Sequence, residues 1–282
     1  MLDDFLIGNY TDKQNATGVT VLLAPQGAIG GVSVRGGAPA THETDLLRAE
    51  NTVEKLNAVV LSGGSAFGLE SISGVMRFLH EKGYGYLAGG FRVPICTGAS
   101  IYDLEYGSFG FPDKNAGYEA CRNATSVAEI KGSIGAGCGA TVCKMNGMDH
   151  AEKSGMAVVT GKRGDLEMAV ISVVNALGNI YDPDTGKLVK SSCGAEGQTS
   201  FSNTTITCIL TNAVLTKAQA NKLADTTQDA YAKCIRPVHT LYDGDSVFVM
   251  SSCRVQADLL ELQMFADSLC CQAILKAVCC ND

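Results

Sequence analysis

The chain has 282 residues, of which 46% are apolar, and a formal net charge of −7. This length allows one large domain or two small ones, and an acidic chain without a basic cluster is not typical of nucleic-acid-binding proteins. The acidic start, Met1–Leu6, lacks the basic and apolar regions of a secretory signal, and no apolar run reaches the roughly 18 residues of a membrane span. We therefore expect a cytoplasmic protein without a membrane partner, and the charged fraction of only 18% favours buried interfaces between subunits.

Twelve cysteines are enough for a disulfide framework or a metal site. No Cys-x-x-Cys occurs, however, and the pairs Cys270-Cys271 and Cys279-Cys280 fall in an apolar segment where helical neighbours would point to different faces. The four histidines also lack the spacing of metal ligands. We therefore predict reduced, buried thiols that act as small hydrophobic residues, and no metal site.

The first part of the chain alternates between runs typical of strands and of helices. In chain order, the predicted elements are two strands (Val19–Ala24, Gly31–Arg35), a helix (Thr41–Glu54), a buried strand (Ala58–Leu61), two helices (Phe67–His80, Tyr118–Thr125), an extended glycine-rich segment (Ser133–Cys143) and a strand (Met168–Val174).

The region between Asn179 and Asn203 is the one stretch that we interpret as a linker, because it is rich in Ser, Gly, Thr and Asp. After it we expect a strand at Thr204–Thr211, a helix that opens with a capping box, Thr216-Lys217-Ala218-Gln219, a strand at Val247–Met250, and a long closing helix at about Gln256–Val278. Alternating strands and helices indicate a layered α/β or α+β protein, but they do not determine the strand order.

The junction of this linker with the next strand has the features of a self-cleaving enzyme. Thr204 begins the strand, and cleavage of the Asn203–Thr204 bond would give it a free α-amine that could act as base for its own hydroxyl. Spacing does not choose between Thr204 and Thr205, and either could be an ordinary β-branched strand residue. Two acids follow in Asp243-Gly244-Asp245, although Asp-Gly is also typical of a hairpin turn.

Two glycine-rich motifs suggest other functions. Gly135–Ala140 fits a loose dinucleotide-binding pattern, but it leads into Thr141–Cys143, which is a poor helix start. Close packing of backbone against backbone is the favoured explanation for these glycines. Gly63–Gly68 is similar to a nucleophile elbow around Ser65, yet Phe67 stands where that motif requires its last glycine. We therefore expect neither nucleotide binding nor a serine nucleophile.

Eight motifs occur in the same order in the self-cleaving aminopeptidase family: Arg35–Pro39, Glu43–Leu47, Leu61–Leu69, Val93–Ile95, Gly135–Lys144, Asn203–Thr205, Leu215–Gln219 and Arg236–Thr240. They span nearly the whole chain, which therefore resembles this family of L-aminopeptidase/D-esterases, β-peptidyl aminopeptidases and nylon-oligomer hydrolases. The resemblance implies an α+β fold, the four-layer αββα sandwich of N-terminal-nucleophile hydrolases. It also implies one domain, 1–282, that cleaves itself into fragments 1–203 and 204–282. Such pairs would assemble into a homotetramer, and no cofactor would be used.

The resemblance assigns the reacting group and its two acids. Thr204 matches the nucleophile, which would first attack the carbonyl of Asn203 and later the amide of a substrate. Asp243 and Asp245 would orient the amine and hydroxyl of Thr204 and could bind a substrate's ammonium group. A threonine nucleophile with Asp-Gly-Asp, where the serine branch has Ser-Gly-Glu, is most similar to the nylon-oligomer hydrolases.

Three further residues match family positions near the nucleophile. Asn175 matches an oxyanion-hole asparagine, Lys144 a lysine beside the nucleophile, and Tyr102 a tyrosine at the substrate carbonyl. From the sequence alone, Asn175 could instead cap the end of a strand, and Lys144 could be a surface lysine.

The expected activity is hydrolysis of amide bonds in small amino-terminated peptides or amides, including 6-aminohexanoate oligomers. Two alternatives remain open. One is acyl transfer of the ornithine-acetyltransferase type, because those enzymes are also self-cleaving threonine proteins. The other is a processed but inactive binding protein.

Overall fold

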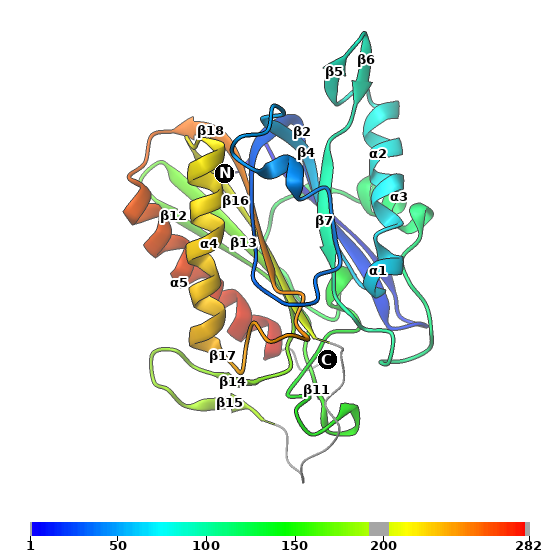
Figure 1. Ribbon diagram of the computed structural model, residues 1–282, viewed down its shortest axis with the longest axis vertical. Helices are drawn as coiled ribbons and strands as arrows, with labels where there is room; N and C mark the ends of the chain where they lie inside the picture. The colour runs from blue at the N-terminus through cyan, green and yellow to red at the C-terminus, as the bar shows by residue number, and fades with distance from the viewer. Residues whose placement is uncertain (1, 192–202, 280–282) are drawn as a thin grey trace.

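The computed structural model describes residues 2–191 and 203–279 of the chain (Figure 1). Part of the predicted linker, 192–202, lies outside the described residues. Among the described residues, eleven strands form one large sheet. Its main path runs β3 (Thr41–His42), β7 (Cys96–Ser100), β4 (Lys55–Ser62), β2 (Thr17–Val34), β18 (Ser246–Val255), β16 (Thr204–Ala213), β13 (Leu166–Asn175), β12 (Met156–Arg163) and β9 (Lys131–Gly132). β1 (Leu6–Asp12) pairs with β2 and with β8 (Thr125–Ser126).

The long strand β2 joins the two halves of this sheet. Its first part pairs with β1, and its last part, Ile29–Val34, pairs with β18. The two predicted strands Val19–Ala24 and Gly31–Arg35 therefore belong to one continuous strand, whose register with β4 shifts between Leu23 and Ala28. Such irregularities bend a strand, and here the chain passes from one layer to the other.

Helices cover the two outer faces of the sheet, as Figure 1 shows. On one side are α1 (Ser65–Gly68), α2 (Ser71–Glu81) and α3 (Lys114–Arg122); on the other are α4 (Lys217–Cys234) and α5 (Leu259–Val278). Alternate side chains of the strands face either these helices or a central core. That central core includes Leu22, Leu61, Ile171, Ile206 and Phe248, which come from both halves of the sheet. The layers are therefore helix, sheet, sheet and helix, which confirms the predicted four-layer αββα sandwich.

The predicted helix at Thr41–Glu54 is wrong. The structure has only β3 and the 3-10 turn η1 (Asp45–Leu47) in this segment. The reason lies far along the chain, where the ammonium of the buried Lys217 donates hydrogen bonds to three backbone carbonyls of this loop. These are the carbonyls of Leu46 (3.0 Å), Asn51 (2.9 Å) and Val53 (3.0 Å). Carbonyl groups held by a lysine are not available for a helical ladder.

The interpretation of Asn179–Asn203 as a linker is also partly wrong. Its first part is a hairpin, β14 (Asn179–Tyr181) and β15 (Leu188–Lys190), and β14 pairs with β17 (Ile235–Arg236). The predicted helix at Tyr118–Thr125 is α3, which begins earlier because Asp113 caps it. The remaining short elements are β5 (Tyr86–Ala88), β6 (Phe91–Val93), β10 (Thr141–Val142), β11 (Glu152–Lys153), η2 (Gly135–Gly137) and η3 (Met148–His150).

The predicted cap of the helix after β16 and the predicted burial of the cysteines are confirmed. Thr216 caps α4 in a capping box with Gln219. Of the ten cysteines in the described ranges, eight are buried. Burial alone raises the pKa of the Cys208 thiol, as expected for an inert core residue. In residues 2–191 and 203–279, no helix has the length and apolar character needed to cross a membrane.

Candidate active site

Thr204 begins β16, and the end of β13 and the start of β18 lie on either side of it. β13 runs antiparallel to β16, so the last residue of β13, Asn175, pairs with the first residue of β16, Thr204. β18 runs parallel to β16, so the residues before β18 reach the same edge. There Asn203 forms a bridge with Asp243. The topology thus brings together residues that the sequence separates.

Two hydrogen-bond donors converge on the carbonyl oxygen of Asn203. One is the hydroxyl of Thr204, and the other is the backbone amide of Gly244, at 3.1 Å. Both Asn203 and Thr204 are buried, at 1% and 4% exposure. A hydroxyl and an amide donor on one carbonyl are the components that an acyl-transfer site with an oxyanion donor requires.

Gly244 was not among the residues selected from the sequence. A Cβ atom at this position would lie 2.6 Å from Oγ1 of Thr204, so the contact requires glycine. The signal was present in the sequence as the glycine between two acids, but Asp-Gly is so common in turns that it carried no specific prediction.

Asp245 binds backbone amides on both sides of the site. Its Oδ1 accepts from the amide of Thr205 at 2.8 Å. Its Oδ2 accepts from the amide of His239 at 3.1 Å and contacts Nδ1 of the same ring at 2.9 Å. With 1% exposure, this buried carboxyl group supports the start of β16.

Asp243 is equally buried, and its Oδ2 accepts from the amide of Thr240 at 2.6 Å. Burial, followed by the charge of Asp245, raises the pKa of Asp243. Its own carbonyl accepts from the amide of Ala38 at 2.9 Å. A Cβ atom at Gly36 would lie 2.1 Å from this carbonyl oxygen. Only glycine therefore fits at this position of the Arg35–Pro39 motif, which packs against the loop that contains Asp243.

Lys144 is fully buried and is therefore not a surface lysine. Its Nζ donates to Oδ1 of Asn175 at 2.9 Å and to the backbone carbonyl of Asn175 at 3.2 Å. Burial lowers the pKa of Lys144 to about 7, against the opposing charges of Asp243 and Glu105. This lysine is poised to change its charge near neutral pH.

Asn175 is oriented by contacts at both ends of its amide. Oδ1 also accepts from the backbone amide of Thr141 at 3.0 Å, and Nδ2 donates to the backbone carbonyl of Tyr102 at 2.9 Å. The structure thus brings Tyr102 to the site through its main chain. Its phenol donates to Oε1 of the exposed Glu105 at 3.1 Å.

The competing motifs have structural explanations. Ser65 begins α1 on one outer face of the sheet, whereas His239 stacks on Tyr231 of α4, which covers the other outer face. In the glycine-rich motif, the amide of Gly135 donates to Thr11, and a Cβ atom at Gly139 would lie 2.2 Å from the carbonyl oxygen of Ala16. These glycines therefore serve close backbone packing, as predicted.

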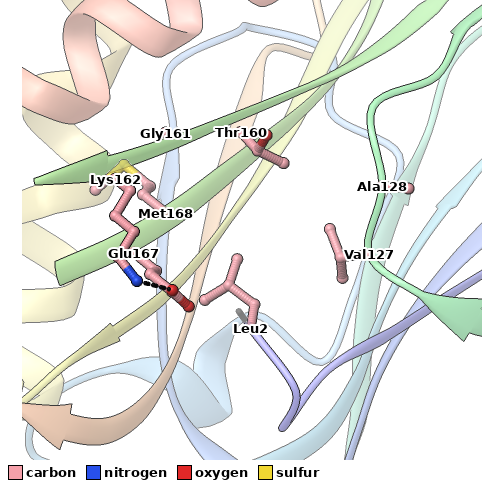
Figure 2. A pocket seen from close by; sticks show the side chains of 8 residues that line it. All are labelled: Leu2, Val127, Ala128, Thr160, Gly161, Lys162, Glu167 and Met168. Carbon is pink, nitrogen blue, oxygen red and sulfur yellow. Dashed lines mark hydrogen bonds and ion pairs between the residues drawn. The ribbon is translucent and has the colours of Figure 1, made fainter. Parts of the chain in front are cut away.

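A cavity of about 330 Å³ lies elsewhere on the sheet (Figure 2). Its lining residues are Leu2, Val127, Ala128, Thr160, Gly161, Lys162, Glu167 and Met168. Figure 2 shows the ion pair between Lys162 and Glu167, at 2.8 Å, on one wall. Glu167 lies near the start of β13 and Asn175 at its end, a separation of about 26 Å along the strand. The cavity is therefore not part of the site around Thr204.

Known protein sequences are similar to this chain over most of its length. The profile of peptidase family S58 matches residues 4–281. An uncharacterized aminopeptidase of Mycobacterium leprae is 38% identical over 268 residues, which cover 86% of this chain and 72% of the relative. A 6-aminohexanoate-oligomer endohydrolase of Kocuria sp. is 28% identical over 267 residues, which cover 87% of this chain and 72% of that protein.

Solved structures share the fold at low sequence identity. The L-aminopeptidase D-Ala-esterase/amidase of Ochrobactrum anthropi, a variant of the Ntn hydrolase fold, has a TM-score of 0.75 at 15% identity, covering 98% of this chain and 84% of that one. A β-aminopeptidase of Burkholderia sp. has a TM-score of 0.69 at 14% identity, covering 97% and 83%. The resemblance and the fold predicted from the sequence are confirmed.

Proposed function

The chain belongs to peptidase family S58, and we propose that it is an amide hydrolase that activates itself by cleavage between Asn203 and Thr204. Membership of this family, with relatives named aminopeptidases and amidases, makes it an amidohydrolase. The observation that supports self-cleavage is the convergence of the Thr204 hydroxyl and the Gly244 amide on the carbonyl of Asn203.

In the first step, the hydroxyl oxygen of Thr204 attacks the carbonyl carbon of Asn203. The Gly244 amide stabilises the negative charge that develops on the carbonyl oxygen. The C–N bond to Thr204 breaks, the amine takes up the hydroxyl proton, and an ester remains. Water hydrolyses this ester to give fragments 1–203 and 204–282, which remain packed in one domain.

Cleavage creates the base for turnover. The new α-amine has a reference pKa of about 7.7–8.0 and can remove the proton of its own hydroxyl. The adjacent Lys144, in its charged form, lowers the pKa of this amine. Thr204 then attacks the amide carbon of a substrate, and Asn175 donates to the oxyanion from its side-chain amide. Water releases the acyl group from the threonine ester.

We assign recognition of the substrate's ammonium group to Glu105. Asp243 and Asp245 are buried and bind backbone amides, whereas Glu105 is exposed beside Tyr102. The expected substrates are small amino-terminated peptides or amides, including 6-aminohexanoate oligomers. Glu105→Gln should raise KM for substrates with a free amino group and leave KM unchanged for their N-acetylated forms; equal effects on both would contradict the assignment.

Intact mass under denaturing conditions tests self-cleavage. Two fragments of roughly 21 and 8 kDa are expected from the 29.5 kDa chain, the smaller beginning at Thr204. Thr204→Ala should remain one inactive chain, and Thr205→Ala, the matched control, should be cleaved. Cleavage of Thr204→Ala at the same bond would exclude Thr204 as the nucleophile. Adding ornithine during turnover of an acyl substrate separates hydrolysis from acyl transfer, since only a transferase would form acylated ornithine.

A further inference from the structure

His239 makes two contacts with a single oxygen of Asp245. Its backbone amide donates to Oδ2 at 3.1 Å, and its ring nitrogen Nδ1 lies 2.9 Å from the same atom. The side chain of His239 is 18% exposed and that of Asp245 is 2% exposed. The contact between the ring and the carboxylate is therefore largely shielded from water.

The ring is fixed in place by Tyr231 of α4. The two rings stack with centroids 5.9 Å apart and an angle of 29° between their planes. Tyr231 is fully buried, and its hydroxyl lies 2.7 Å from Oγ1 of Thr207 and 3.2 Å from the carbonyl oxygen of Ser246. It thus contacts both β16 and β18, the strand that begins with Thr204 and the strand that follows Asp245.

These contacts determine which way the carboxylate of Asp245 faces. Because His239 occupies Oδ2, Oδ1 is directed to the amide of Thr205 at 2.8 Å. That amide belongs to the peptide bond that follows Thr204. The position of the nucleophile therefore depends on a chain of contacts from Tyr231 through His239 and Asp245.

Packing alone does not explain an imidazole at this position. Nε2 of His239 is buried and has no hydrogen-bond partner among residues 2–191 and 203–279. Buried polar atoms without partners are costly, and a hydrocarbon ring would stack on Tyr231 without this cost. The favourable contribution that offsets it is the charge-assisted hydrogen bond from Nδ1 to Asp245.

We propose that His239 is a positioning residue for both self-cleavage and amide hydrolysis, acting through Asp245 on the peptide that carries Thr204. This inference rests on the proposed function of Thr204. His239 does not touch the reacting atoms; it holds the carboxylate that holds the nucleophile.

The test compares two substitutions at His239. His239→Asn keeps an N–H donor at the position of Nδ1, and asparagine tolerates the left-handed backbone conformation found there, φ 55°. His239→Leu removes the donor. An exposed histidine, His80, provides the control His80→Leu. The measurements are the half-time of self-cleavage, kcat and KM of the fully cleaved protein, and the midpoint of thermal unfolding.

His239→Leu should slow self-cleavage and lower kcat by about 10- to 100-fold, the effect expected for one hydrogen bond to a charged group, with KM nearly unchanged. His239→Asn should recover most of both rates, and His80→Leu should match the wild type. Wild-type rates in His239→Leu would overturn the proposal, as would equal losses in both variants that follow their unfolding midpoints. Failure of the proposed function has a different signature, since the wild type itself would then not be cleaved.

Discussion

Asn175 and Thr204 form the last antiparallel pair of β13 and β16. The amide of Asn175 is held by Lys144 and Thr141 at its oxygen and by the carbonyl of Tyr102 at its nitrogen. An oriented amide beside the proposed nucleophile is what stabilisation of an oxyanion requires, because a donor that is already in place needs no reorganisation during the reaction.

Gly244→Ala should block self-cleavage while the protein still folds. The added Cβ atom would lie 2.6 Å from Oγ1 of Thr204, so the hydroxyl and the Gly244 amide can no longer reach the Asn203 carbonyl together. Loss of such a donor typically slows acyl transfer by about 100- to 1,000-fold. Time-resolved intact mass measures this rate. Leu241→Ala, at an 80% exposed position of the same loop, is the control, and equal rates in the two variants would contradict this role for Gly244.

Asp245→Asn should reduce both self-cleavage and turnover. An asparagine can still accept from the amide of Thr205, but it loses the charge that attracts the His239 ring. Asp243→Asn should reduce the rates less at acidic pH than at neutral pH. Burial and the charge of Asp245 raise the pKa of Asp243, so a neutral asparagine differs less from the wild-type side chain as the pH falls. Rates of the two single variants and of the double variant between pH 5 and pH 8 provide the measurement. Full activity of the double variant would be incompatible with the proposed mechanism.

Lys144→Met should stabilise the protein and weaken its activity. The pKa of Lys144 is lowered from 10.5 to about 7 in the folded state. Above about pH 10.5 the lysine is neutral in both the folded and the unfolded state, so its burial does not lower the stability of the fold. As the pH falls from 10.5 to 7, the lysine takes up a proton only in the unfolded state, and the folded state loses stability. Below pH 7 the full cost of burying the charge remains. Replacing a buried charge by an apolar side chain of similar size often stabilises by about 1–4 kcal/mol.

Thermal unfolding of Lys144→Met at pH 6 and pH 9 tests this, and the gain in the midpoint should be larger at pH 6. Turnover should fall, because Asn175 loses a donor that orients its amide. Lys222→Met, at a largely exposed lysine, should change neither quantity. A lower midpoint for Lys144→Met at pH 6 would show that the lysine stabilises the fold.

Asp103 predicts a second pH dependence of stability. This buried carboxyl accepts from the amide of Gly64 at 2.6 Å and from the hydroxyl of Thr17 at 2.8 Å, and burial raises its pKa from 3.8 to about 6. Its contribution to stability is present below about pH 4 and is lost as the pH rises through 6.

Asp103→Asn keeps both hydrogen bonds, since its oxygen can accept from Gly64 and its amide can donate to Thr17. The free energy of unfolding of this variant should exceed that of the wild type above pH 6 and should change less between pH 4 and pH 6. Urea unfolding at several pH values measures both quantities. An unchanged slope in the variant would mean that Asp103 does not titrate in this range.

Short apolar runs between polar segments indicated most of the strands and helices of this protein, whereas the four-layer arrangement was implied only by the family resemblance. The apolar runs of β13 and β16 are local features of the sequence, and they are typical of strands that are buried on both faces, as the structure shows. The motif around Asn203–Thr205 is also local, so the resemblance could identify the candidate nucleophile. The predicted helix at Thr41–Glu54 failed because the carbonyls of that loop bind Lys217, a residue far along the chain.

Tertiary structure alone decided how the site is supported. The amide of Gly244 reaches the Asn203 carbonyl, and His239 reaches Asp245, only because β18 runs parallel to β16 and begins at the same edge of the sheet. Strand order and direction depend on the packing of both faces of the sheet at once, so they cannot be predicted from any single segment of the sequence. The sequence could therefore indicate which group reacts, whereas the fold decided which groups hold it in place.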